Sequence, residues 1–322
     1  MVVFTSTLQQ MLMMFILIAA GYVLRKCRVL PENSHAIMSR LETYIFIPAL
    51  NLHTQMSKCN VTTFSNNWTL IVYGLALSLV FIVLSKPAAK LFVPNATTAN
   101  DLYLRNIYRY SLVFGNYGFM GNYIILGVWG SGFFFKYGLF CFFISILCSS
   151  WGLYILIPKD QNAGKLENLK KGLLTPPVIS LIIGICIGLM GLGERVTAPL
   201  MAALEGTSQC QGPVAMLLAG FVIGGYNVKE MLLNKKVYIA TAVRLLLIPS
   251  ALMIVLSMFG VSKEVRLLTL IAFGTPLGLN TIVYPSAYGG DPKTGASMAM
   301  VSHTLSVATI PVLYYLFFVL VH

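Results

Sequence analysis

The chain alternates long apolar runs with short polar connections. A bilayer core of about 30 Å needs about 20 helical residues, because an α-helix rises about 1.5 Å per residue. Ten runs approach that length, so the pattern predicts ten membrane-spanning helices. The runs are 4–24, 36–53, 70–84, 111–128, 137–157, 177–192, 199–225, 237–259, 267–288 and 296–321.

The composition identifies lipid as the solvent of these runs. Hydrophobic residues make up 57% of the 322 residues and charged residues only 10%. The mean hydropathy is +0.80. A soluble domain carries about 25% charged residues, so this chain has too few to cover a surface exposed to water. We therefore predict an all-α polytopic membrane protein embedded in a lipid bilayer.

The basic residues indicate how the chain is oriented. The net charge is +12, but the lysines and arginines lie mainly in the short connections between runs. With ten spans, the connections on one side carry 16 of the 22 basic residues and those on the other side carry 5. The positive-inside rule places the richer side in the cytoplasm. Both termini are then expected outside, in a multi-pass protein of the plasma membrane, and no nucleic-acid partner is needed to explain the charge.

A polar segment at 159–171 divides the ten runs into five and five. An odd number of spans in each half makes the second half insert upside down, which is the inverted-repeat arrangement of many secondary transporters. We predict a first repeat at 1–158, a cytoplasmic linker at 159–173 and a second repeat at 174–322. Both halves contain a span interrupted by glycine or proline, but these residues are frequent in membrane helices, so this similarity could also be coincidental.

Polar and helix-weakening residues interrupt the fourth and ninth runs. Backbone can leave the helix at membrane depth only where protein or water covers it. We predict two broken helices that cross near the bilayer centre and form a substrate site. The residues assigned to substrate binding are Asn116, Tyr117, Asn122, Thr275, Asn280 and Thr281, and those assigned to the helix breaks are Gly118, Gly121 and Pro276. In the alternative interpretation, the glycines allow tight helix packing and the asparagines bond across helices.

Other polar residues lie inside the runs. Arg244 either compensates an anionic charge or supports the crossing, or its side chain extends to the interface. Glu42 is expected to pair with Arg40, and Glu205 with Arg195; the alternative is that these acids take part in proton coupling. His303 is expected to be a buried histidine with satisfied hydrogen bonds, or a group that titrates near neutrality.

The sequence contains none of the common catalytic motifs. There is no HExxH, no GxSxG and no phosphate-binding P-loop, so we expect no enzyme activity. The cysteines do not have metal-ligand spacing, and no cofactor is expected. Two GxxxG patterns, at 184–188 and 220–224, allow close helix contact either within one chain or between two.

Six motifs resemble those of the auxin efflux carrier family in its short prokaryotic form, over essentially the whole chain. They are RLETYIFIPALNL at 40–52, FGNYGFMG at 114–121, TPPVISLIIGICIG at 175–188, GPVAMLLAG at 212–220, RLLLIP at 244–249 and TPLGLNTIVYPSAYGGD at 275–291. The resemblance implies an elevator-type carrier of small organic anions such as auxin, malate or malonate. It also implies a dimeric scaffold of helices 1, 2, 6 and 7, and a transport domain of helices 3–5 and 8–10.

Within that resemblance, the crossover asparagines of the family correspond to Asn116 and Asn280. Many relatives have proline two residues after the glycine that corresponds to Gly121, whereas this chain has Asn122 and Tyr123. We therefore expect a weaker break in the fourth helix. The coupling ion, H⁺ or Na⁺, is left open. A channel or a membrane receptor is the alternative class, although a channel would need a continuous polar lining.

Overall fold

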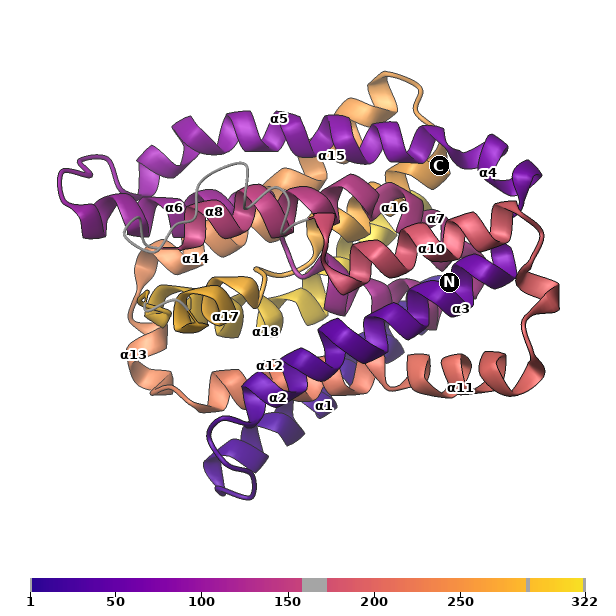
Figure 1. The fold of residues 1–322 in the computed structure, drawn as a ribbon. Helices are drawn as coiled ribbons and strands as arrows, with labels where there is room; N and C mark the ends of the chain where they lie inside the picture. Colours follow the sequence, from indigo (N-terminus) through magenta and orange to yellow (C-terminus); the bar gives the residue numbers. More distant parts are fainter. Residues whose placement is uncertain (1, 158–172, 288–289, 321–322) are drawn as a thin grey trace.

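The computed structural model describes residues 2–157, 173–287 and 290–320. These residues form a bundle of helices (Figure 1). Within them, the extended backbone contributes one isolated antiparallel bridge, between Gly115 and Leu277, and no strand. Most of the predicted linker lies outside the described residues.

The helices follow the apolar runs. In the first half they are α1 (Val2–Lys26), α2 (Ser34–Leu41), η1 (Glu42–Phe46), α3 (Ile47–Lys58), α4 (Val61–Asn67), α5 (Thr69–Phe92), α6 (Ala99–Val113), η2 (Tyr117–Gly121), α7 (Asn122–Leu147), η3 (Cys148–Gly152) and α8 (Leu153–Leu156). In the second half they are α10 (Pro176–Leu189), η5 (Gly193–Arg195), α11 (Ala198–Gln209), α12 (Gln211–Gly224), α13 (Val228–Leu232), α14 (Lys235–Ala242), η6 (Val243–Leu247), α15 (Ile248–Met258), α16 (Lys263–Gly274), α17 (Asn280–Ala287), α18 (Lys293–Tyr315) and η7 (Leu316–Leu320).

Most predicted ranges fall on one helix or a run of helices. The fourth range, 111–128, is wrong at its start, because α6 begins at Ala99 and most of this helix was not predicted. Among the described residues, five stretches are long and apolar enough to cross a membrane: Thr5–Lys26, Val61–Phe92, Tyr117–Leu156, Lys235–Met258 and Lys293–Leu320. The structure therefore agrees with an all-α polytopic membrane protein. The count of ten spans and the inverted repeat remain predictions.

The chain reverses direction inside α7, at Gly130. This residue has φ +75° and ψ −176°, a backbone conformation that residues with a side chain rarely adopt. The hydroxyl of Tyr137 donates to the carbonyl of Tyr117 at 3.1 Å. In a straight helix these residues would be about 30 Å apart, since each residue adds about 1.5 Å. The stretch Tyr117–Leu156 is therefore two antiparallel arms.

The helices pack in two groups. In the first, α1 packs along α12, and α3 packs along α10 and α11. Glycines allow the close approach: a Cβ on Gly220 would collide with the α1 backbone at Ile18, and one on Gly188 would press against Cys59, the residue directly after α3. Both GxxxG patterns therefore serve contacts within one chain. In the second group, α5, α6 and α7 pack together, as do α14–α16 with α18.

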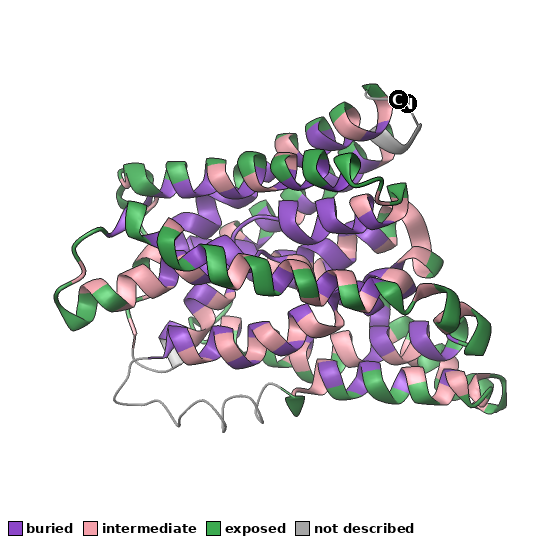
Figure 2. Cartoon of the chain, turned by 90° about the horizontal axis from the view of Figure 1, so that it is seen from above, coloured by how far each residue is buried: buried purple, intermediate pink, exposed green. Residues whose placement is uncertain are grey.

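The outward faces of the helices are apolar. Figure 2 shows buried residues inside the bundle and exposed ones along its outer faces. On α5, the exposed side chains include Val83, at 70% exposure, and Leu91, at 82%. Continuous exposed apolar surface of this kind is typical of contact with lipid. In Figure 1 the marks of both chain ends lie toward the side of α4 and α11, and in the view of Figure 2 they overlap.

Two helices are interrupted where they meet. After α6, Phe114 adopts an extended conformation, and after α16, Thr275 does the same. The two segments run antiparallel, and the backbone N–H of Asn116 donates to the carbonyl of Pro276 at 2.7 Å. A Cβ on Gly115 would lie 2.7 Å from the carbonyl oxygen of Thr275, so the crossing needs glycine there. The interruption between α6 and η2, in the fourth predicted span, is present although Asn122 and Tyr123 stand where the resemblance led us to expect a proline.

Arg244 lies beneath this crossing and is fully buried. Its guanidinium donates to the carbonyls of Leu112 and Val113, both at 3.2 Å, at the end of α6. It also donates to those of Ala272 at 3.4 Å and Thr275 at 3.5 Å, at the end of α16. These carbonyls belong to helix ends that lack partners within the helix. Arg244 therefore does not reach the membrane surface.

The expected pairing of Glu42 with Arg40 is wrong. Glu42 is fully buried, whereas Arg40 is exposed on the other side of the turn. Among the described residues, the ion pairs are Arg25 with Glu32 and Lys136 with Glu264. Glu205 and Arg195, both exposed, form no ion pair in this part of the chain either.

Replacing Arg244 tests its structural role. Arg244→Met removes four backbone contacts while keeping an apolar stem of similar length. Hydrogen bonds to a charged donor contribute about 1.5–3 kcal/mol each, so we expect a loss of about 3 kcal/mol or more. Thermal denaturation in detergent, followed by size-exclusion chromatography, measures the change. The control, Arg195→Met at an exposed position, should leave the melting temperature within a degree or two; equal effects of the two substitutions would contradict the role.

Candidate functional site

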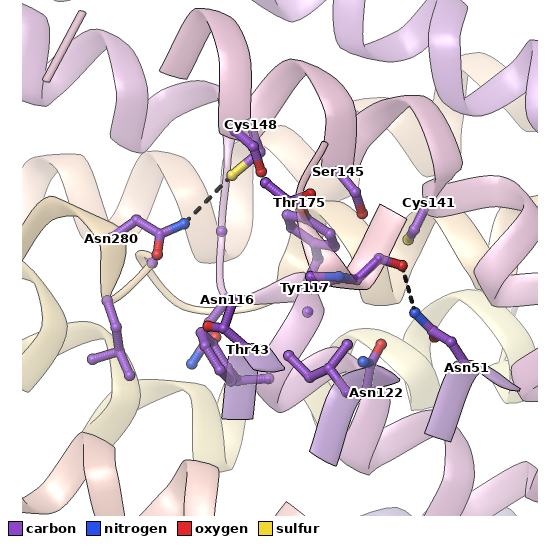
Figure 3. A pocket seen from close by; sticks show the side chains of 18 of the residues that line it. Thr43, Asn51, Asn116, Tyr117, Asn122, Cys141, Ser145, Cys148, Thr175 and Asn280 are labelled. Atoms are coloured by element: carbon purple, nitrogen blue, oxygen red, sulfur yellow. Dashed lines mark hydrogen bonds between the residues drawn. The ribbon is translucent and has the colours of Figure 1, made fainter. Parts of the chain in front are cut away.

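A cavity of about 160 Å³ lies beside the crossing. One wall is formed by the two interruptions and the helices that follow them; α7 contributes Cys141 and Ser145, and η3 contributes Cys148. The opposite wall comes from the other group of helices, with Thr43 and Asn51 from η1 and α3 and Thr175 and Pro177 at the start of α10. Figure 3 shows these side chains around the space. The cavity therefore lies between the two helix groups.

The structure brings some of the predicted site residues together and leaves others outside. Those that line the cavity are Asn116, Tyr117, Gly118, Asn122 and Asn280. Those that do not are Gly121, Arg244, Thr275, Pro276 and Thr281. The two threonines complete local backbone hydrogen bonds: Thr275 donates to Ala272 at 3.3 Å and Thr281 donates to Gly278 at 2.9 Å.

Asn116 presents an unused acceptor. Nδ1 of His303 lies 2.7 Å from the carbonyl of Ala299, and this contact requires a proton on Nδ1. In a neutral ring Nε2 is then an acceptor, and the amide nitrogen of Asn116 donates to it at 3.0 Å. The carboxamide oxygen of Asn116 is buried and has no hydrogen-bond partner among the described residues. His303 thus has both ring nitrogens in hydrogen bonds, as expected of a satisfied buried histidine.

Asn280 is held by two neighbours. Its amide nitrogen donates to the hydroxyl of Tyr110 at 2.8 Å and lies 3.4 Å from the sulfur of Cys148. The same hydroxyl and sulfur are 3.0 Å apart. These contacts fix the carboxamide at the start of α17, beside the cavity (Figure 3).

The sequence analysis missed the opposite wall. The amide of Asn51 donates to the carbonyl of Pro177 at 2.9 Å and to the hydroxyl of Ser180 at 3.3 Å. The sequence did contain an indication that Asn51 belongs to the site, because its carboxamide lies within an apolar run, three residues after Pro48. Thr43, Ser145 and Thr175 gave no comparable signal, because single hydroxyl residues are common in membrane helices.

The negative and positive ends of the interrupted helices face different parts of the structure. The C-terminal ends of α6 and α16, which carry partial negative charge, point at Arg244. The N-terminal ends of η2 and α17, which carry partial positive charge, lie at Tyr117 and Asn280 on the cavity wall. A cavity facing two positive helix ends and several amide groups is suited to an anion.

These features define a helical membrane protein with a polar site at the crossing of two interrupted helices. A family model described as membrane transport protein matches residues 6–314. The chain belongs to this family, and the resemblance found in the motifs is thereby confirmed. A search of curated proteins gave no match.

Thiol labelling tests the cavity. Cys148 lines it, whereas Cys59 is buried at 5% exposure against α10 without lining it. In two variants that each keep one of these cysteines, a small methanethiosulfonate reagent should modify Cys148 faster than Cys59. Both thiols are buried, at 3% and 5% exposure, but only Cys148 borders the cavity through which the reagent can reach it. Intact-mass spectrometry of the folded protein measures modification. Faster reaction at Cys59 would contradict the cavity described here.

Proposed function

We propose that the protein is a secondary transporter of small organic anions, such as mono- or dicarboxylates or auxin-like acids. The observation that carries the proposal is the pair of positive helix ends that face one cavity together with Asn116 and Asn280. The helix ends can offset the charge of a carboxylate there. The amide nitrogens of Asn116 and Asn280 already donate to His303 and Tyr110, so the amide donor left for the carboxylate is the second N–H of Asn116. The membership of a transporter family, not an enzyme family, supports the same class.

The proposed mechanism is alternating access of the elevator type. The scaffold is assigned to α1, α2–α3, α10 and α11–α12, which pack on one another, and the transport domain to the remaining helices. In support, the cavity lies between these two groups rather than inside either one. A site at such a boundary can be exposed to either side of the membrane when one group moves against the other.

The boundary has features that favour sliding. Glycines of α7 face glutamines of the other group: a Cβ on Gly127 would collide with Gln10, and one on Gly138 with Gln55. The amide of Gln55 is buried, and neither its oxygen nor its nitrogen has a hydrogen-bond partner among the described residues. A smooth surface with unused polar groups has few contacts to break when the helices move, and the unused groups can find partners in a second position.

The two repeats, 1–158 and 174–322, are proposed to be inverted copies. In support, α6 and α16 are each interrupted at their C-terminal ends, and both end at the same arginine. The protein is proposed to lie in the plasma membrane with both termini outside. The marks of both chain ends in Figure 1, which lie toward the side of α4 and α11, are consistent with termini on one side.

A homodimer is proposed through the scaffold. Since both GxxxG patterns are used within the chain, another face must form the dimer contact. The outer surface of α10 offers exposed Ile179, Ile182 and Ile183. This apolar face is available to a second copy or to lipid.

Substitution of Asn280 tests the site. Asn280→Ala should abolish saturable uptake in proteoliposomes, because it removes a carboxamide from the cavity wall, while the protein still folds. The anion for the assay is chosen by a thermal-shift screen against mono- and dicarboxylates, since a ligand that binds the folded state raises the melting temperature.

Its matched control is Asn95→Ala, which changes an exposed loop asparagine. Uptake kinetics that remain normal in Asn280→Ala would remove this residue from the site. Counterflow in the wild type supports a carrier. Flux that does not saturate and passes unitary currents would show that the protein is a channel.

A further inference from the structure

Glu42 is an acid inside the membrane with nothing to neutralise it. It is the first residue of η1 and has 0% exposure. Neither carboxyl oxygen has a hydrogen-bond partner among the described residues, and none of their ion pairs includes it. Acids within membrane spans are rare, and those that occur mark proton or ion pathways in many transporters.

No charged group compensates Glu42 from the helices packed on it. These helices are α2, α3, α10, α11 and α12. The titratable side chains that they carry are His35, Arg40, His53, Lys58, Cys186 and Glu205, none of which forms an ion pair with Glu42. The polar groups beside the carboxyl are the side chain of Gln211 and the backbone N–H of Ala215, both neutral.

An ionised carboxylate in this position would be costly. Burying a charge without a partner costs several kcal/mol, and the group takes up a proton instead. A protonated Glu42 is neutral and can donate a hydrogen bond. We therefore assign the neutral acid to the conformation seen here.

Glu42 also lies near α7 and η2, which belong to the group of helices that is proposed to move. The next residue, Thr43, lines the cavity. Gln211, next to Glu42, is followed by Gly212, which lies directly against the ring of Tyr123 in α7. Helix α12 also packs on η2, the helical turn after the first interruption. Displacement of η2 and α7 would therefore uncover the surroundings of Glu42 and admit water.

We propose that Glu42 is a proton-binding site that couples proton movement to anion transport. The carboxyl holds a proton in the conformation seen here and releases it to water when the movement of α7 and η2 hydrates it. Before the helices return and exclude water, the carboxylate takes up a proton from water on the opposite side of the membrane and becomes a neutral acid once more. This inference rests on the proposed transport function, and it names the coupling ion of that function as H⁺.

The test uses full-length protein in proteoliposomes loaded with a pH-sensitive dye. Glu42→Gln replaces the acid with a neutral side chain of the same shape that cannot release a proton. We expect the wild type to show substrate-dependent proton flux and accumulation driven by a pH gradient. Glu42→Gln should lose both, by at least tenfold, while it still exchanges substrate across the membrane at equal pH. Glu205→Gln, which changes an exposed acid of α11, should behave as the wild type does.

The outcomes of this test distinguish a failure of the proton site from a failure of the proposed transport function. Substrate exchange without proton flux in the wild type, or normal proton flux in Glu42→Gln, would overturn the proton site and leave the carrier intact. If the wild type shows no exchange at all, the proposed function fails and the proton site fails with it.

A second measurement does not depend on transport or on the Gln variant. Infrared spectroscopy of the wild type at neutral pH should show the band of a protonated, buried carboxyl group. Glu42→Asp keeps an acid in place and should retain both that band and the proton flux. Absence of the band from the wild type would overturn the assignment.

Discussion

The structure depends on the contacts between one buried guanidinium and the ends of two helices. A helix that stops inside a bilayer leaves carbonyl groups that water cannot reach. Arg244 supplies donors to such carbonyls on α6 and α16 together. Its positive charge also lies where the two helix dipoles are negative. Without this contact, neither interruption would be stable at this depth, and the cavity beside the crossing would have no wall.

The same arrangement sets the electrostatic character of the site. The negative helix ends are directed at Arg244, so the cavity faces only the positive ends, at Tyr117 and Asn280. Asn116 and Asn280 add carboxamides that are held by neighbours rather than by solvent. The site can therefore attract an anion without a basic side chain of its own. The buried arginine acts on the site indirectly, because it allows the two chain segments to cross.

The apolar runs placed most of the long helices, because length and hydropathy determine which segments can lie in lipid. They missed most of α6, which is partly polar and contains Asp101, Arg105 and Arg109. The runs could not predict that the chain reverses direction at Gly130 itself, because the predicted spans ended at 128 and began again at 137. The presence of Asn116 and Asn280 on one cavity wall was predictable, because both lie where a helix is interrupted. Their hydrogen-bond partners, His303 and Tyr110, were not. The positions of Thr275 and Thr281 were not, because side-chain direction within an interruption depends on which backbone groups need partners. Asn51 and the isolation of Glu42 required knowledge of which helices pack together.

The contact between Arg244 and α6 also has a consequence for how the protein is made. Arg244 follows Leu112 by 132 residues. A ribosome that adds about 5–20 residues per second needs roughly 7–26 s to cover that distance. During this interval, the end of α6 has entered the membrane without the side chain that completes it. The helices up to α6 must therefore wait, incompletely bonded, until the segment that carries Arg244 is synthesised, and a host cell would have to shield them from proteolysis in the meantime.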